Sequence, residues 1–226
     1  MIHECAVLTV AHGPRSELVM GDRVHLPGLK GVSDSERIFR VRRIIDHPKA
    51  GRGHGFDVRL LMLQFDEGQW GNEKGSVRGQ LAQRAFDLRN CATLEAHDEF
   101  RDLRIAGFSD SSGESQGKNG HRRKWREVTY SSKDQEPAIH GHDAEREYVF
   151  KACECDVSKQ EQGRCIAFGD SGSPVFMGKA EENKLVAMYV RRSINEPVSA
   201  NPHLVALRLN KGLIDWLDAI RQRYAP

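Results

Sequence analysis

Ser171 is the residue of this chain with the clearest capacity for chemistry. It lies between glycines in the run Gly169-Asp170-Ser171-Gly172-Ser173-Pro174. Glycines tolerate a strained turn that a β-carbon would forbid, and such a turn exposes a hydroxyl beside converging N–H groups. An acyl-transfer enzyme needs this combination of a nucleophile and donors for the developing oxyanion. The same residue types also form ordinary surface turns, so this run alone leaves both interpretations open.

Two further segments supply partners for such a serine. The apolar residues 5–11 predict a strand, and His12 follows it directly. Asp57 opens a second apolar run, Val58–Leu63, which predicts a buried strand. An imidazole titrates near neutral pH and can act as a general base, and a carboxylate can orient it. The order His, Asp, Ser, each at a strand edge, therefore predicts a catalytic triad. The alternative is that these residues have no catalytic role and are a surface histidine, a strand cap and a serine in a turn.

The segments around these three residues resemble the trypsin/chymotrypsin family of serine peptidases. The separation of 45 residues between His12 and Asp57 is usual in that family. Further stretches of the chain also resemble family segments, namely Ala106-Gly107-Phe108, Leu185–Val190 and Leu213–Leu217. The resemblance implies a serine endopeptidase that hydrolyses peptide bonds through an acyl-enzyme. It assigns Ser171 as nucleophile, His12 as base and Asp57 as the orienting carboxylate.

The resemblance also implies an oxyanion hole and a substrate pocket. The backbone N–H groups of Gly169 and Ser171 would form the oxyanion hole. Cys165 stands where trypsin-like members carry an acid, so cleavage after Lys or Arg is not supported. The pocket wall would include Val190, Arg191 and Arg192. Guanidinium groups facing inward would favour an acidic substrate side chain, whereas groups facing solvent would have no effect.

Many short strands and one terminal helix predict an all-β fold. Residues 66–78 predict a loop, and residues 81–95 an irregular crossing between two halves. Apolar residues from Leu213 to Ile220 share one helical face, which predicts an amphipathic helix over about 211–224. The resemblance implies two six-stranded antiparallel β-barrels with a C-terminal helix. The expected domains are 1–95, with His12 and Asp57, and 96–226, with Ser171.

Two departures from the family favour a rival interpretation. Only 11 residues precede His12, so the first barrel is expected to be incomplete at its N-terminus. In the family, a new N-terminal amine pairs with the aspartate beside the serine, here Asp170. The sequence has no Ile-Val-Gly-Gly segment to supply that amine. The alternative is therefore a catalytically silent or truncated member that acts as a binding or regulatory module.

The composition bears on partners and location. Lys and Arg number 34 against 32 Asp and Glu, which argues against a nucleic-acid binder. The sequence shows no apolar run long enough for a membrane span, so no membrane association is expected. Its first residues lack the basic and apolar regions of a secretory signal, so we expect no signal peptide in this chain. The resemblance implies an extracellular location, a polypeptide substrate and a monomer, without a cofactor.

Two sequence pairs have ligand types suited to a metal ion. They are His140 with His142 and Cys153 with Cys155, each two residues apart. Zinc-site cysteines are usually farther apart, and nothing requires the two pairs to meet. We therefore expect no metal site. The five cysteines are an odd number, so at least one thiol is free.

Overall fold

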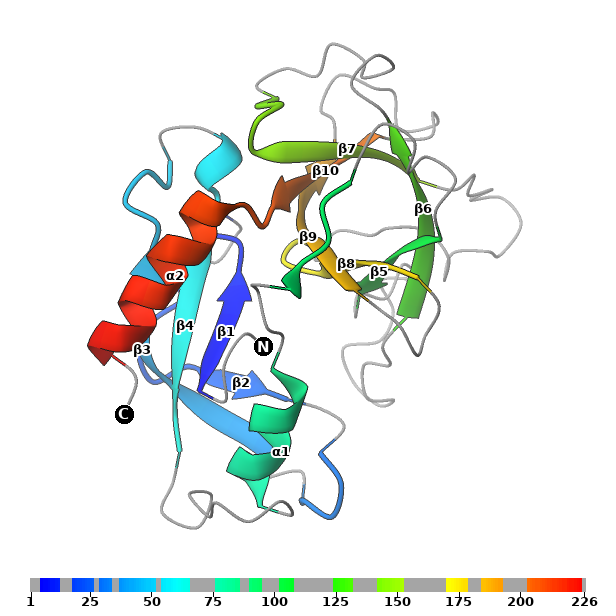
Figure 1. Cartoon of the computed structure of the whole chain (residues 1–226). Coiled ribbons are helices and arrows are strands. Elements are labelled where there is room, and N and C mark those ends of the chain that lie inside the picture. Colours follow the sequence, from blue (N-terminus) through cyan, green and yellow to red (C-terminus); the bar gives the residue numbers. More distant parts are fainter. Residues whose placement is uncertain are drawn as a thin grey trace. The chain divides into compact units, whose positions relative to one another are not determined.

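The computed structural model describes two compact units, and its elements are shown in Figure 1. Unit 1 comprises residues 1–52, 56–88 and 215–226, and unit 2 comprises residues 53–55 and 89–214. The described residues within these units are 5–12, 18–26, 29–33, 37–51, 54–65, 76–85, 90–94, 102–107, 124–131, 142–152, 170–178, 184–192 and 203–224.

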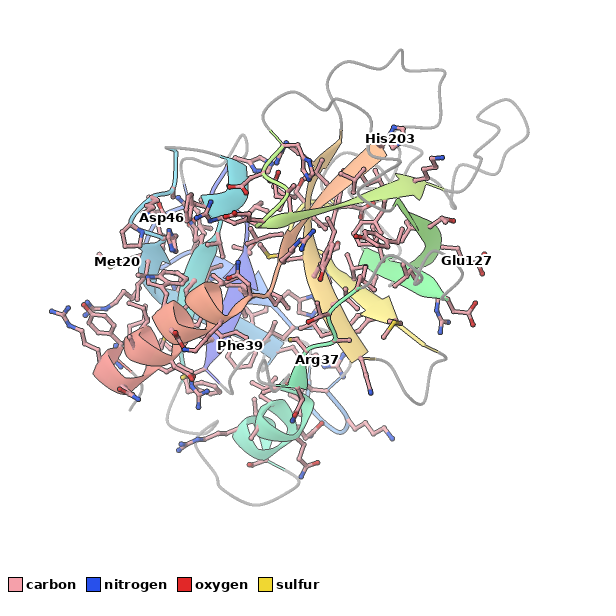
Figure 2. All side chains as sticks on the ribbon, turned by 45° about the horizontal axis from the view of Figure 1, so that its top comes forward. Met20, Arg37, Phe39, Asp46, Glu127 and His203 are labelled. Carbon is pink, nitrogen blue, oxygen red and sulfur yellow. The ribbon has the colours of Figure 1, made fainter. Side chains whose placement is uncertain are left out.

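Unit 1 is built on a four-stranded antiparallel sheet. The strands lie in the order β1 (Ala6–Thr9), β4 (Arg59–Gln64), β3 (Ile38–Asp46) and β2 (Arg23–His25). A short 3₁₀ turn, His54–Phe56, precedes β4. The apolar run in β4 is buried along its length, as expected for an inner strand. Phe39 of β3, labelled in Figure 2, packs edge-to-face against Phe65 with ring centroids 5.4 Å apart.

A short helix, α1 (Val77–Arg84), was not predicted from the sequence. The hydroxyl of Ser76 caps it by accepting the N–H of Gly79 at 3.1 Å. Val77 and Leu81 lie one turn apart and are both buried. The side-chain amide of Gln80 exchanges two 2.8 Å hydrogen bonds with the backbone of Lys30. The sequence did contain a helix signal, namely Ser76 followed by the apolar residues Val77 and Leu81, four positions apart. Gly79, within the helix, has a low helix propensity and obscured this signal.

Unit 2 contains a closed six-stranded barrel, whose strands are all paired antiparallel. Its core includes Tyr130, Tyr148 and Phe150, with ring centroids between 5.6 and 6.2 Å apart. The strand order around the barrel is β10 (His203–Arg208), β7 (Glu147–Ala152), β6 (Lys124–Ser131), β5 (Leu103–Gly107), β8 (Pro174–Met177) and β9 (Lys184–Arg192).

The C-terminal helix α2 (Lys211–Tyr224) begins in unit 2 and ends in unit 1. The side chain of Asn210 caps it by accepting the N–H of Leu213 at 3.0 Å. Within unit 1, the ring of Trp216 lies 5.0 Å from that of His47. The guanidinium of Arg43 lies 4.3 Å from the centre of the Tyr224 ring. Neither helix in the described residues is long and apolar enough to cross a membrane.

The predicted fold class is confirmed. Unit 2 has the expected six-stranded barrel, and the sheet of unit 1 has four strands within the described ranges. The C-terminal helix is also present. The predicted domains, residues 1–95 and 96–226, stay a prediction.

Candidate active site

Ser171 lies in a tight turn that is held by β9 of the same unit. The N–H of Gly172 donates to the carbonyl of Tyr189 at 2.8 Å, and the N–H of Tyr189 donates to the carbonyl of Ser173 at 2.8 Å. Ser173 also donates its N–H to the carbonyl of Asp170 at 3.0 Å. Asp170 is fully buried, whereas Ser171 is half-buried. Ser171 therefore lies in a turn that two backbone hydrogen bonds attach to the buried strand β9.

The backbone conformation at Gly172 explains why a glycine follows the serine in this turn. Its φ is 91°, a region that residues with a β-carbon rarely adopt. Pro174 then starts β8, where a proline at the first strand position is tolerated. The local sequence thus specifies a sharp reversal directly before the strand.

His12 and Asp57 meet in unit 1 because their strands pair. In the β1–β4 ladder Thr9 lies opposite Arg59, so the residues just beyond these strand ends are neighbours. One carboxylate oxygen of Asp57, Oδ1, accepts the N–H groups of Ala11 at 3.0 Å and His12 at 2.8 Å. The other, Oδ2, is hydrogen-bonded to Nδ1 of the His12 ring. The aspartate therefore fixes both the backbone and the imidazole of His12.

The surroundings of Asp57 keep it ionised. Burial alone would raise the pKa of its carboxyl group, since the side chain is only 16% exposed. Hydrogen bonds from the His12 side chain and from the N–H groups of His12 and Ala11, with the charge interaction with His12, outweigh burial and lower the pKa. Because an ionised carboxylate can only accept hydrogen bonds, Nδ1 of His12 carries the proton in this contact.

The predicted site residues divide between the two units. His12 and Asp57 form the contact that the sequence predicted, whereas Ser171 belongs to the other unit. The complete triad stays a prediction for this reason. Gly169 and Cys165 lie outside the described residues, so the oxyanion hole and the pocket base also stay predictions.

The predicted pocket-wall residues end strand β9. Val190 is fully buried, and Arg191 and Arg192 are the last residues of the strand. Two nitrogens of Arg191 bind the carboxylate of Glu147, with Nη1 to Oε1 at 2.6 Å and Nη2 to Oε2 at 3.1 Å. The guanidinium of Arg191 is thus held by a carboxylate of the same chain, an arrangement that neither sequence alternative anticipated.

Glu147 is the polar residue that sequence reasoning missed. It is fully buried and lies 44 residues from its arginine partner in the chain. The only local signal was an acidic residue before the apolar residues of β7, and glutamate is ordinarily solvent-exposed. Its partner could not be inferred without knowledge of the barrel order.

The described residues hold no group of three or more metal-ligand side chains. Of the two sequence pairs considered for a metal, His140, Cys153 and Cys155 lie outside the described ranges. His142 is described and is half-buried.

A solved structure and a family model both match this chain. A solved structure titled kallikrein-related peptidase 10 in complex with Zn²⁺ has a TM-score of 0.57 and 16% sequence identity, and the match covers 97% of this chain and 86% of that one. This likeness shows the fold. A search of curated proteins found no match. The family model described as Trypsin matches residues 1–197. Because this match spans most of the sequence, the chain belongs to the trypsin family.

Proposed function

We propose that the protein is a serine endopeptidase that hydrolyses peptide bonds through an acyl-enzyme. Ser171 is the nucleophile, His12 the general base and Asp57 the residue that orients His12. The observation that carries the proposal is the Asp57 carboxylate, which binds both the ring and the N–H of His12. This contact supports the proposal because it orients the imidazole, and a serine nucleophile requires an oriented general base.

The proposed reaction has two halves. The hydroxyl oxygen of Ser171 attacks the substrate carbonyl as Nε2 of His12 takes its proton, and a C–O bond forms. The C–N bond then breaks as His12 returns the proton to the leaving amine, which leaves an ester on Ser171. Water attacks this ester with His12 again as base, and the acid product leaves. The N–H groups of Gly169 and Ser171 are proposed to bind the oxyanion, with about 3 kcal/mol from one such donor.

The family membership supports polypeptides as the substrate class. We further propose that the protein acts as a monomer outside the cell, by analogy with family members that are secreted. No cleavage preference for Lys or Arg is proposed, because Cys165 replaces the acid at the expected pocket base.

Labelling with a serine-reactive fluorophosphonate tests the proposal directly. We expect the wild type to be labelled, and Ser171→Ala to lose both the label and hydrolysis of peptide esters by several orders of magnitude. Thr129→Ala, which removes an exposed hydroxyl from β6 of the same unit, is the matched control and should behave as wild type.

Two outcomes would contradict the proposal. Retained labelling in a folded Ser171→Ala variant would place the nucleophile elsewhere. A folded wild type that is neither labelled nor active would instead support the alternative of a silent binding or regulatory module.

A further inference from the structure

Asp57 is the central residue of a tight turn directly before β4. The N–H of Val58 donates to the carbonyl of Phe56 at 2.8 Å, and a hydrogen bond between residues two apart defines a γ-turn. Asp57 lies in neither a helix nor a strand, because the 3₁₀ turn ends at Phe56 and β4 begins at Arg59. The contacts that hold Phe56 and Val58, the two ends of this γ-turn, therefore help to set the direction of the Asp57 carboxylate.

His47 contacts both ends of the γ-turn within unit 1. It directly follows Asp46, labelled in Figure 2, which lies opposite Arg59 in the last pair of the β3–β4 ladder. One step beyond that pair, the N–H of His47 donates to the carbonyl of Val58 at 3.0 Å. Its ring stacks on the ring of Phe56, with centroids 5.0 Å apart and planes inclined by 20°. His47 thus holds Val58 through its backbone and Phe56 through its side chain.

Further contacts fix the rings of His47 and Phe56. Nδ1 of His47 accepts the N–H of Lys49 at 3.2 Å. The ring of Trp216, in helix α2, lies 5.0 Å from the ring of His47 at an angle of 60°. The ammonium group of Lys49 lies 5.0 Å from the centre of the Phe56 ring, a distance at which a cation and a ring attract each other. The aromatic contacts therefore connect helix α2 to the residue before Asp57.

We infer that His47 is a positioning residue for the proposed catalytic pair of Asp57 and His12. It holds both ends of the turn around Asp57, and Asp57 binds the ring and the N–H of His12. The inference rests on the proposed function, in which His12 is the general base. A misplacement of about 1 Å in a reacting geometry can lower a rate by about 100-fold. The packing of Phe56, one residue from Asp57, therefore bears on the rate.

The first test compares His47→Ala with His25→Ala by steady-state kinetics on a peptide anilide. His47→Ala keeps the backbone N–H that binds Val58 but removes the ring from Phe56. We expect its kcat to fall by about tenfold or more and its KM to stay within about twofold of wild type, because the orientation of the base matters mainly in the transition state. His25 is an exposed residue of β2 in the same unit, so His25→Ala should match the wild type.

A proton NMR signal from Nδ1–H of His12 distinguishes positioning from a loss of stability. This signal should lie far downfield in the wild type, because the Asp57 carboxylate accepts that proton, and it should broaden or disappear in His47→Ala. Phe39→Leu is the control, since Phe39 is buried at the opposite end of β3 from His47. It should lower stability but keep both the signal and kcat. A fall in kcat of His47→Ala without a change in the signal would overturn the inference.

Two less drastic substitutions keep the inference testable if His47→Ala does not fold. His47→Phe preserves an aromatic ring against Phe56, and water can bind the N–H of Lys49, an exposed residue, in place of Nδ1. His47→Asn preserves a polar acceptor but has no ring. We expect His47→Phe to keep kcat within about threefold of wild type and His47→Asn to lose about tenfold. The reverse order, or equal values of kcat, would overturn the inference.

Fluorophosphonate labelling separates failure of the inference from failure of the proposed function. If folded wild type is labelled and folded His47→Ala keeps the wild-type kcat and Nδ1–H signal, the inference is wrong and the proposed function stands. If folded wild type is not labelled, the proposed function is wrong, and the inference with it.

Discussion

At the scale of single residues, Asp57 has the most closely specified role. Its Oδ1 accepts two backbone N–H groups, which Asn could still satisfy, but its Oδ2 faces Nδ1 of His12. In Asp57→Asn an amide N–H would face that nitrogen and favour the tautomer with a proton on Nε2. We expect kcat to fall by about 10⁴-fold with little change in KM.

Asp46→Asn is the control for this prediction, since Asp46 pairs with Arg59 rather than with His12. Steady-state kinetics on both variants provide the measurement. Equal losses in the two variants would argue that general electrostatics, rather than the orientation of His12, explains the effect.

The lowered pKa of Asp57 predicts how the stability of the protein depends on pH. Its folded pKa lies below the ordinary value of 3.8, so the unfolded chain binds a proton at this residue more readily than the folded chain. The stabilisation from Asp57 is therefore fully present above the ordinary value, and it is lost as the pH falls through the lower, folded value. We expect the urea midpoint of the wild type to drop more steeply below about pH 4 than that of Asp57→Asn. Parallel curves would contradict this expectation.

Gly172 and Gly178 allow backbone strain to be separated from function. Both have positive φ, 91° and 98°, but only Gly172 adjoins Ser171, whereas Gly178 follows β8. We expect an alanine at either position to lower the free energy of unfolding by about 1–2 kcal/mol. Only Gly172→Ala should slow fluorophosphonate labelling, because it moves the turn that carries Ser171. If Gly178→Ala slows labelling equally, the effect comes from the barrel as a whole.

At the scale of elements, helix α2 is held mainly by its apolar face. Leu217 is 1% exposed, whereas Gln222 lies on the exposed side of the same helix. We expect Leu217→Ala to lower the free energy of unfolding by about 2–4 kcal/mol, since it leaves a cavity. Gln222→Ala should change it by less than about 0.5 kcal/mol. Denaturant titration measures both values, and a similar small change in both would show that the helix is loosely packed.

The elements also show what the sequence could predict. The apolar run predicted over Val58–Leu63 is β4 within one residue at each end, because burial on both faces demands such a run. The contact between His12 and Asp57 was predicted because each adjoins a recognisable strand. Helix α1 was missed because its glycine weakens the helical signal. The pair of Glu147 and Arg191 depends on a barrel closure that no local pattern reveals.

At the scale of the whole molecule, each structural unit is formed from segments that are separated in the sequence. Unit 1 combines the N-terminal sheet with residues 215–226, whereas unit 2 is formed from the middle of the chain and residues 53–55. Helix α2 contributes residues 211–214 to unit 2 and residues 215–224 to unit 1. Tertiary contacts such as that of Trp216 with His47 hold the C-terminal part of helix α2 in unit 1.

This arrangement predicts that removal of residues 215–226 affects the two units unequally. Unit 1 would lose the contact of Trp216 with His47, the contact of Tyr224 with Arg43, and the buried Leu217. The barrel of unit 2 would keep all six strands and the aromatic cluster at its core. Hydrogen exchange followed by mass spectrometry should therefore show faster exchange in β3 and β4 and little change in β5 to β10. Gln222→Ala, which changes an exposed side chain of the same helix, is the control and should alter neither unit. Equal loss of protection in both units would instead mean that the barrel cannot hold its structure without the helix, and that the two units unfold as one cooperative body.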